Sequence, residues 1–269
     1  MLHEDYFLGV HQRELERLDR QHTAWHPSTQ QLIEKAGLPN CRTILDLGCG
    51  PGFTTLEIAK HCPQSTITAL DKATLYQQFL EHQIEKLTIP NVRPLYADVL
   101  HLTQQPGQFD GAFCRWFLAF LIPNLEEVLA AVYEKLAPGG VFAAMEYLTL
   151  GNVVSSPPNK DFDANTRAWN NFYLTNDGDA SIGTYLTGML EEIGFTITYQ
   201  DCVGGFAEVG HRWWHWWRDA HLNFAPVFVE QGLMTQSELE GATAFFAEQE
   251  NNPTGFIYTP IILRVVARK

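Results

Sequence analysis

Residues 44–55, with the sequence ILDLGCGPGFTT, decide the fold of this chain. An apolar stretch of strand character, residues 44–47, leads into Gly48, Gly50 and Gly52, and a helical pattern follows them. Glycine permits positive φ and lets backbone N–H groups approach a ligand closely, because it has no Cβ atom. The stretch therefore predicts a buried strand, a turn that contacts a small ligand, and a helix.

The spacing of the glycines separates two ligand classes that use such turns. The dinucleotide pattern G-x-G-x-x-G requires its third glycine at the position of Phe53. A phosphate loop requires a Gly-Lys-Ser/Thr ending, and the first lysine after the glycines is Lys60. The sequence therefore favours neither an NAD-dependent oxidoreductase nor a P-loop enzyme.

The composition is that of one globular domain of 269 residues, 45% of them hydrophobic. The formal net charge of −13 opposes non-specific attraction to nucleic acid. The five cysteines include no C-x-x-C pair, so neither a disulfide framework nor a zinc site is expected. The N-terminus lacks signal-peptide features and no window resembles a membrane span, which predicts a cytoplasmic protein.

Strand and helix patterns alternate after the glycine turn. Further strands are predicted over residues 65–70, 92–97, 109–114 and 141–147, the last after the helix stop LAPGG at 136–140. The alternation predicts a parallel sheet with helices on both faces and ligands outside the carboxyl ends of its strands. The polar or aromatic residues at those ends are Asp71, Asp98, Arg115, Trp116 and Glu146.

Asp71 follows the second predicted strand, about 20 residues past the glycine turn. At that spacing a carboxylate binds the hydroxyl pair of a ribose. The alternative is an N-cap for the helix predicted over residues 73–86, and both roles can coexist. Asp98 likewise fits an ordinary turn at the end of the third strand.

Segments outside the alternation are predicted to be mostly helical. Residues 1–40 should form helices that break near His26 and Pro27 and resume over residues 28–36, either capping the site or covering a sheet edge. A helix is predicted over 182–193. Strands are predicted over 195–202 and 256–267, with helices in the long segment between them.

The run HRWWHWWR at residues 211–218 is the least ordinary segment. It is either a lid over a planar or cationic substrate or an inserted helix packed on the core. An interfacial membrane helix would need more Lys and Arg on its polar face. His211 and His215 have i, i+4 spacing but lack the Glu of H-E-x-x-H, so no metal site is predicted.

Five motifs together resemble the class I methyltransferases that depend on S-adenosylmethionine (SAM). They are LDLGCGPG at 45–52, Asp71, Ala97-Asp98-Val99, Phe109-Asp110 and LAPGG at 136–140. The resemblance implies an α/β, Rossmann-like fold with a seven-stranded, mostly parallel sheet and helices on both faces. Residues 1–269 would form one such domain, with helical cap or lid elements at 1–40, 151–180 and 204–254.

The resemblance also implies the cofactor site. The glycines would pass beside the methionyl portion of SAM, Asp71 would hold the ribose, and Asp98 with Val99 the adenine. A looser similarity to a bacterial subgroup with small-molecule substrates places Tyr6 and Gln21 over the cofactor. The implied SAM-binding residues are Tyr6, Gln21, Gly48, Cys49, Gly50, Gly52, Asp71, Lys72, Ala97, Asp98, Val99, Arg115 and Trp116.

Methyl transfer from a sulfonium is an in-line displacement that needs alignment, desolvation and, for some acceptors, a base. No Asn-Pro-Pro-Tyr tetrapeptide follows the fourth strand, and no metal-binding acid pair of the catechol type is evident. Candidate bases, each with a structural role as the alternative, are Glu146, His26, His211 and His215. Candidate pocket walls are Trp116, Tyr147, Trp169, Tyr173 and Trp213.

The sequence thus predicts a SAM-dependent methyltransferase that acts on a small molecule in a lidded pocket, without nucleic acid, membrane or metal partners. The alternatives are a peptide or protein methyltransferase with an open groove and a non-catalytic SAM-binding protein. The acceptor atom stays open at this point, and so does the oligomeric state, for which a dimer is one option.

Overall fold

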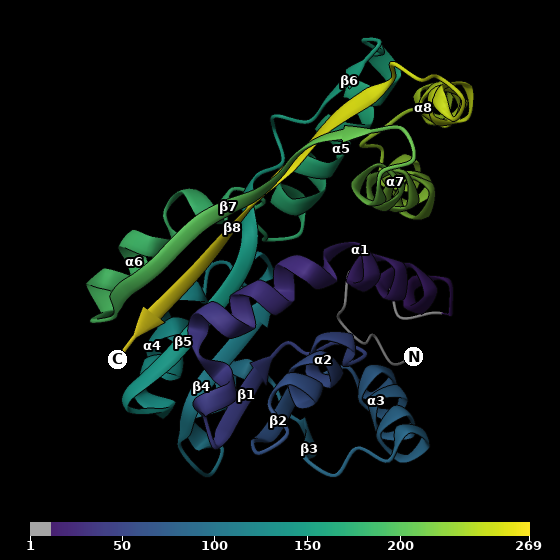
Figure 1. The fold of residues 1–269 in the computed structure, drawn as a ribbon. Helices are drawn as coiled ribbons and strands as arrows, with labels where there is room; N and C mark the ends of the chain where they lie inside the picture. The colour runs from purple at the N-terminus through teal and green to yellow at the C-terminus, as the bar shows by residue number, and fades with distance from the viewer. Residues whose placement is uncertain (1–11) are drawn as a thin grey trace.

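The computed structural model describes residues 12–269, which have an α/β fold. One β-sheet with parallel and antiparallel strands has helices packed around it (Figure 1). Five strands are parallel neighbours in the order β3-β2-β1-β4-β5. The strand order reverses between β1 and β4, and ligands of open α/β sheets bind at such a point. These strands are β1 (Thr43–Leu47), β2 (Thr66–Asp71), β3 (Val92–Tyr96), β4 (Phe109–Arg115) and β5 (Leu136–Thr149).

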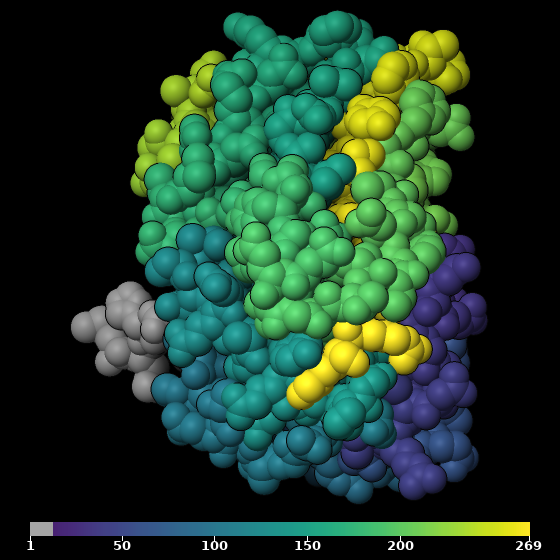
Figure 2. All heavy atoms as spheres, turned by 90° about the vertical axis from the view of Figure 1, so that its left-hand side faces the viewer, coloured from purple at the N-terminus to yellow at the C-terminus, as the bar shows by residue number. Residues whose placement is uncertain are grey.

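The other edge of the sheet is antiparallel. β8 (Phe256–Arg268) pairs with β5 on one side and with β7 (Thr196–Glu208) on the other, and Figure 2 shows yellow β8 atoms beside green β7 atoms. The short β6 (Val154–Ser156) pairs with the part of β8 beyond the end of β5. The described sheet therefore has eight strands where the sequence predicted seven, because the chain after β5 continues alongside β8.

The helices next to the parallel strands form where apolar residues recur at helical spacing and can be buried against the sheet. In α4 (Leu125–Lys135) the buried residues Leu125, Val128, Leu129 and Val132 recur at i, i+3, i+4 and i+7. The other helices of this group are α2 (Phe53–His61) and α3 (Thr74–Leu87), while α6 (Leu186–Ile193) packs against α4 and the antiparallel strand β7. Short 3-10 segments are η1 (Leu38–Asn40), η2 (Val99–Gln104), η3 (Leu118–Phe120) and η4 (Ile182–Thr184).

Four more helices surround the carboxyl ends of the parallel strands. They are α1 (Gln12–Ala36), α5 (Lys160–Thr175), α7 (Arg212–Glu230) and α8 (Gln236–Gln249). α7 contacts α1, α5 and α8, and α1 also contacts α2. In Figure 1, α1 therefore lies between the parallel part of the sheet and the group formed by α5, α7 and α8.

α1 is one helix that continues through Pro27, so the predicted break near His26 and Pro27 is wrong. A proline inside a helix removes one backbone hydrogen bond and crowds the preceding turn. Trp25, Leu32 and Ile33 are fully buried on the two sides of the proline. The free energy gained by packing these side chains against the core offsets the loss of the hydrogen bond at Pro27.

Two boundaries in the C-terminal half also differ from prediction. β7 continues to Glu208, so the inserted segment starts after that residue and not at residue 204, because β8 is long enough to extend the ladder. The helix predicted over 182–193 is divided into η4 and α6. At Gly183 the chain touches β5 so closely that a Cβ would lie 2.7 Å from Tyr147 O, and this contact interrupts the helix.

Buried aliphatic and aromatic residues from the sheet and the helices form one connected core. Within residues 12–269, no helix has both the length and the apolar character needed to cross a membrane.

Candidate functional site

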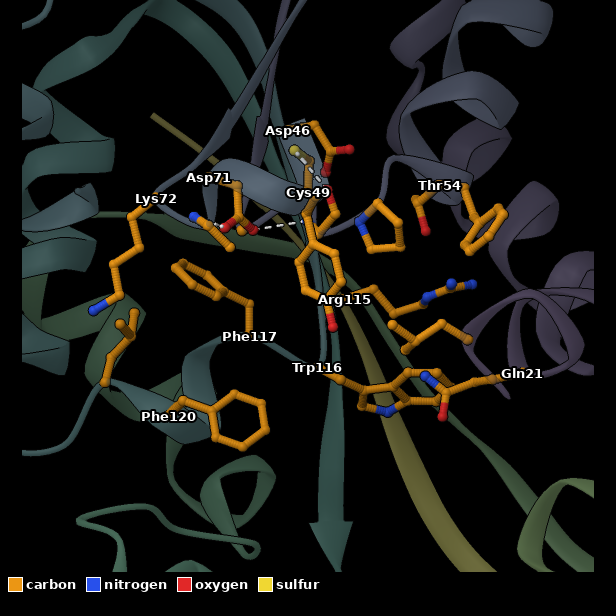
Figure 3. Close-up of a pocket in the computed structure, with 18 of the residues that line it drawn as sticks. Gln21, Asp46, Cys49, Thr54, Asp71, Lys72, Arg115, Trp116, Phe117 and Phe120 are labelled. Carbon is orange, nitrogen blue, oxygen red and sulfur yellow. Dashed lines mark hydrogen bonds between the residues drawn. The ribbon is translucent and has the colours of Figure 1, made fainter. Parts of the chain in front are cut away.

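A cavity of about 630 Å³ opens at the carboxyl ends of β1, β2 and β4 (Figure 3). It brings together eleven of the thirteen residues implied to bind SAM. Gly52 does not line it, and Tyr6 lies outside the described residues. The eleven lining residues are Gln21, Gly48, Cys49, Gly50, Asp71, Lys72, Ala97, Asp98, Val99, Arg115 and Trp116.

The glycine turn forms one wall of this cavity. Gly48, Gly50 and Gly52 have φ values of 60, 54 and 83°, which lie in the region that favours glycine. A Cβ on Gly48 would lie 2.1 Å from the ring of Phe117, and one on Gly52 would lie 2.4 Å from Leu80. Gly48 and Gly50 therefore face the cavity, whereas Gly52 permits close packing against α3.

Asp71, at the end of β2, fixes the glycine turn. Its Oδ2 accepts a hydrogen bond from Gly50 N and its Oδ1 accepts one from Ala73 N, both at 2.8 Å. Burial raises the pKa of Asp71, although these N–H donors oppose the shift. The structural role that the sequence offered as the alternative is thus present in a modified form. Asp71 accepts a hydrogen bond from Ala73 N, directly before α3, and not from an N–H group in the first turn of that helix. Each oxygen keeps a second lone pair for a ligand.

Asp98 follows β3 and starts η2. Its Oδ1 accepts a hydrogen bond from Leu100 N at 3.0 Å, which is the turn role that the sequence offered as the alternative. Its Oδ2 lies 3.8 Å from Lys72 Nζ, so the two predicted residues form an exposed ion pair at the cavity. Ala97, Asp98 and Val99 still line the cavity as one segment.

Asp46 and Arg115 bring opposite charges to the cavity behind the glycine turn. Asp46 is 2% exposed, and Thr55 Oγ1 donates to its Oδ2 at 2.6 Å. Burial raises the pKa of Asp46 to about 7, while Thr55 and the charge of Arg115 oppose the shift. Arg115 donates to Thr29 Oγ1 at 2.9 Å and lies 5.1 Å from the ring centre of Trp116. Burial lowers its pKa to about 10, and within residues 12–269 it forms no salt bridge.

Glu146 holds the turn after β4 in place. Its Oε1 accepts hydrogen bonds from Phe117 N and Leu118 N, both at 2.8 Å. The preceding residue, Trp116, has φ of 53°, which costs free energy for a bulky side chain. Glu146 is fully buried, which raises its pKa to about 7. It is a positioning residue for Trp116 and does not line the cavity.

The half of the cavity away from the glycine turn is an aromatic chamber. We use this name for its walls from the turn after β4, from η3, β5, α5 and α7 with the residues that directly follow the first three of these, and for Arg17 of α1. Trp213, a predicted wall, is absent from it because its ring stacks on Trp25 at 5.1 Å. The chamber residues are Arg17, Trp116, Phe117, Phe120, Leu121, Tyr147, Leu150, Trp169, Tyr173, Asn176, Trp216, Trp217, Ala220 and Phe224.

A buried polar network joins α1 to α7 beside the chamber. Arg17 donates to both carboxylate oxygens of Glu14 at 2.8 Å, and Asn223 Nδ2 donates to the same carboxylate at 2.8 Å. Gln21 Oε1 accepts from Arg17 at 2.7 Å and from Trp216 Nε1 at 3.0 Å. These two donors hold the amide of Gln21, which Figure 3 shows beside Trp116 at the cavity wall.

None of the candidate bases lines the cavity. His26 Nδ1 lies 3.1 Å from Glu57 Oε2, and Glu146 faces the backbone of the turn after β4. His211 accepts a hydrogen bond from Trp213 N at 3.2 Å and caps α7, and His215 is half-buried on that helix. The structural alternative describes the contacts of His26, Glu146 and His211. Nδ1 of His215 is buried without a hydrogen-bond partner in the described chain, but this residue does not line the cavity, so we assign no base.

His22, His26 and Glu57 bring three possible metal-ligand atoms within 4.8 Å of one another. These groups are already paired, since His26 and Gln30 contact the Glu57 carboxylate and Arg115 lies 3.4 Å from His22 Nδ1. Burial and the charge of Arg115 lower the pKa of His22 to about 3. A guanidinium this close opposes a second cation. We interpret the cluster as a network that joins α1 to α2.

Sequence reasoning missed several residues of the cavity. Asp46 had a visible signal, because it is the acid two residues before the glycine turn. Arg17 had none, since it belongs to an ordinary charged helix pattern. The missed lining residues also include Thr54, Tyr76, Phe117, Phe120 and Phe224.

Comparison with known proteins gives a consistent result for the core of the chain. Residues 44–140 match a family model described as a methyltransferase domain. A trans-aconitate 2-methyltransferase of Deinococcus radiodurans is 34% identical over 100 residues, which cover 37% of this chain and 36% of that protein. An (S)-coclaurine N-methyltransferase of Thalictrum flavum subsp. glaucum is 35% identical over 108 residues, covering 40% and 29%. The chain thus spans about a third of the length of these curated relatives.

The fold extends further than the sequence similarity. A structure described as a putative sarcosine dimethylglycine methyltransferase from Galdieria sulphuraria superposes with a TM-score of 0.58. The match covers 99% of this chain and 94% of that one at 13% identity. At that identity the likeness establishes the fold alone.

Proposed function

We propose that the chain, whose residues 44–140 match a methyltransferase domain, is a class I SAM-dependent methyltransferase that transfers a methyl group from SAM to a small molecule. One observation carries the proposal. The glycine turn, Asp71 and residues 97–99 leave three neighbouring strands and line a single cavity. As part of the proposal, residues 1–269 form one domain in which α1, α5 and α7 roof the site.

The lining residues fit the nucleoside part of SAM. Asp71 already binds the turn through one lone pair on each oxygen, which leaves acceptors for the two ribose hydroxyls. Residues 97–99 offer backbone groups and the side chains of Asp98 and Val99 at the next strand end, where the adenine would lie. A Cβ on Gly50 would have no neighbour closer than 4.0 Å, so this glycine leaves room for the ligand between these two places, whereas Gly48 makes room for the ring of Phe117.

Asp46 and Arg115 fit the amino-acid part of SAM. That part carries an ammonium and a carboxylate, and the cavity offers one group of each opposite sign. Arg115 lacks a carboxylate partner within the described chain, so a bound carboxylate would complete its ion pairing. A bound ammonium would favour the charged form of Asp46, whose pKa burial raises to about 7.

SAM supplies an activated methyl group on a positively charged sulfur. The protein's part is to hold the acceptor in line with that group and to exclude water. The turn at Trp116, held by Glu146, lies between the glycine turn and the aromatic chamber, so it can position both ligands. We propose that the acceptor enters the chamber.

A small acceptor is supported by two lines of reasoning. The names of the two relatives above refer to small molecules, trans-aconitate and coclaurine. The chamber is bounded by α1, α5 and α7 within a cavity of about 630 Å³, a size suited to a cofactor with a compact second ligand.

The test is a calorimetric titration of the protein with SAM and with S-adenosylhomocysteine. We expect both to bind and to raise the melting temperature, since a ligand at 100 times its dissociation constant stabilises the folded state by about 2.7 kcal/mol. Incubation with SAM and a panel of small acceptors, read by mass spectrometry, should then give a product heavier by one CH₂. Absence of binding by both nucleosides would overturn the proposal.

A further inference from the structure

The aromatic chamber has an uneven distribution of charge. Three carboxylates line the cavity, and all of them, Asp46, Asp71 and Asp98, are at the end that holds the glycine turn. The chamber itself has no carboxylate among its described lining residues, and its one charged side chain is the guanidinium of Arg17. Glu14 pairs with that guanidinium from outside the cavity. A ligand in the chamber therefore meets no negative group of the described chain.

The faces of several chamber rings are already covered. Trp116 stacks with Tyr147 at 5.9 Å and with Trp216 at 5.8 Å, with interplanar angles of 20 and 9°. Tyr173 stacks with Phe120 at 5.3 Å. The negative potential of an aromatic ring lies over its face, and its edge is positive. Stacking therefore removes much of the surface that attracts a cation.

Guanidinium groups of the protein itself lie over two of the aromatic rings. The guanidinium of Arg17 lies 5.1 Å from the ring centre of Phe224, and that of Arg115 lies 5.1 Å from Trp116. A cationic ligand needs an open ring face within about 6 Å. Glu14 balances the charge of Arg17, so the like charge that a cationic ligand would meet here comes mainly from Arg115, which is unfavourable at short range.

We propose that the aromatic chamber takes a planar aromatic acceptor that is uncharged or anionic, and rejects a cationic amine. The proposal rests on the proposed function in taking the chamber as the acceptor site. It specifies the substrate class by charge and shape: flat rings fit between aromatic walls, oxygen-bearing groups suit positive ring edges, and a polycarboxylate lacks enough cations to bind.

The test compares two planar two-ring probes of similar size that differ in charge, 7-hydroxycoumarin and N-methylquinolinium. Each is titrated calorimetrically into the full chain, with and without saturating S-adenosylhomocysteine. We expect 7-hydroxycoumarin to bind at least about tenfold more tightly, which is about 1.4 kcal/mol. Equal affinity, tighter binding of the cation, or binding of neither probe would overturn the proposal.

A matched pair of variants, one within α5 and one directly after its last residue, tests the electrostatic cause. Asn176 and Asn170 each donate Nδ2 to the carbonyl four residues earlier, at 2.7 and 3.2 Å, but only Asn176 lines the cavity. Asn176→Asp adds a carboxylate to the chamber, and Asn170→Asp makes the same change outside it. We expect Asn176→Asp to weaken 7-hydroxycoumarin binding and to strengthen N-methylquinolinium binding about tenfold, with Asn170→Asp unchanged.

Identical affinities in the two variants would contradict the electrostatic argument. The wild-type comparison of probes keeps the proposal falsifiable if a variant fails to fold. Binding of S-adenosylhomocysteine reports separately on the proposed function: loss of that binding with the probe preference intact would refute SAM as the cofactor and leave the chamber's selectivity standing.

Discussion

Asp71 holds the glycine turn through one backbone bond to each carboxylate oxygen, and in the proposed site each oxygen would accept a second bond from the ribose. Asp71→Ala should lower the affinity for S-adenosylhomocysteine at least about tenfold, through loss of the ribose contact and of the fixed turn at Gly50. Calorimetric titration measures the change. Wild-type affinity in this variant would refute the ribose assignment.

Asp110→Ala is the matched control for that variant. Asp110 Oδ2 also accepts backbone bonds, from Arg42 N at 2.8 Å and Thr43 N at 3.1 Å, but at the amino end of β4, away from the cavity. The control should lose stability, by about 1–3 kcal/mol for the unsatisfied groups, and keep its nucleoside affinity.

Arg115 can be tested by removing only its charge. Arg115→Met retains most of the side-chain length, so the expected loss of about 1.5–3 kcal/mol in binding S-adenosylhomocysteine reflects the ion pair with the ligand carboxylate. The comparison ligand is 5′-methylthioadenosine, which lacks the amino-acid part and should bind the variant as well as it binds the wild type. An equal loss for both ligands would show that Arg115 acts on the nucleoside end or on the fold.

Glu146 should make stability depend on pH. Burial raises its pKa from 4.5 to about 7, so the folded state holds the proton more firmly than the unfolded chain. Its contribution to stability is therefore greatest below pH 4.5 and is lost as pH rises to about 7. Glu146→Gln cannot ionise, so the variant should gain stability relative to wild type between pH 5 and 8, by up to about 3 kcal/mol.

Urea unfolding of both proteins at several pH values measures this difference. The shift of Asp46 has the same sign but is common to both proteins and cancels in the comparison. A difference that stays constant with pH would mean that Glu146 ionises normally in the folded state.

Between elements, the contact of α1 with α7 depends on a buried ion pair. Glu14 is 0% and Arg17 4% exposed. Glu14→Gln alone should cost roughly 3–5 kcal/mol, because it leaves a buried guanidinium without its counter-charge. The double variant Glu14→Gln with Arg17→Met should recover much of that loss. Urea unfolding of the single and double variants tests this, and additive losses would contradict it.

The sequence predicted a helix or strand well where a single stripe of apolar residues is buried on one side of the element, as in α4. It failed at Pro27, because the rule that proline ends helices is local, whereas the packing of Trp25 and Ile33 comes from distant parts of the chain. The tryptophan run packs on the core, as one of its two interpretations predicted, and the lid interpretation stays a prediction. Trp214 packs on α8 against Phe246 at 5.6 Å, while the next turn of α7 lines the cavity.

Across the whole molecule, the two halves of the cavity differ in how far the sequence predicted them. The glycine turn, Asp71 and Asp98 were predictable, because carboxyl ends of parallel strands meet at one edge of a sheet. The chamber was predictable only in part, through Trp116, Tyr147, Trp169 and Tyr173. The position of α7 depends on how far β7 and β8 extend beyond the parallel strands, and no local pattern encodes that length.

The same division predicts that the two halves bind their ligands independently. Trp169 is 6% exposed, with its ring 4.9 Å from Phe224 and 5.0 Å from Phe228, so Trp169→Ala should cost about 3–5 kcal/mol of stability. Below its melting temperature the variant should bind S-adenosylhomocysteine normally and lose 7-hydroxycoumarin, whereas Asp71→Ala should do the reverse.

Trp214→Ala is the control that distinguishes loss of packing within the protein from loss of contact with the acceptor. Trp214 is fully buried on the opposite side of α7 and does not line the cavity. Its removal should cost a similar amount of stability and leave both affinities unchanged, because the chamber walls stay in place. If Trp214→Ala also abolished coumarin binding, the chamber would depend on the rigidity of α7 as a whole, and Trp169 could not be identified as a wall that contacts the acceptor.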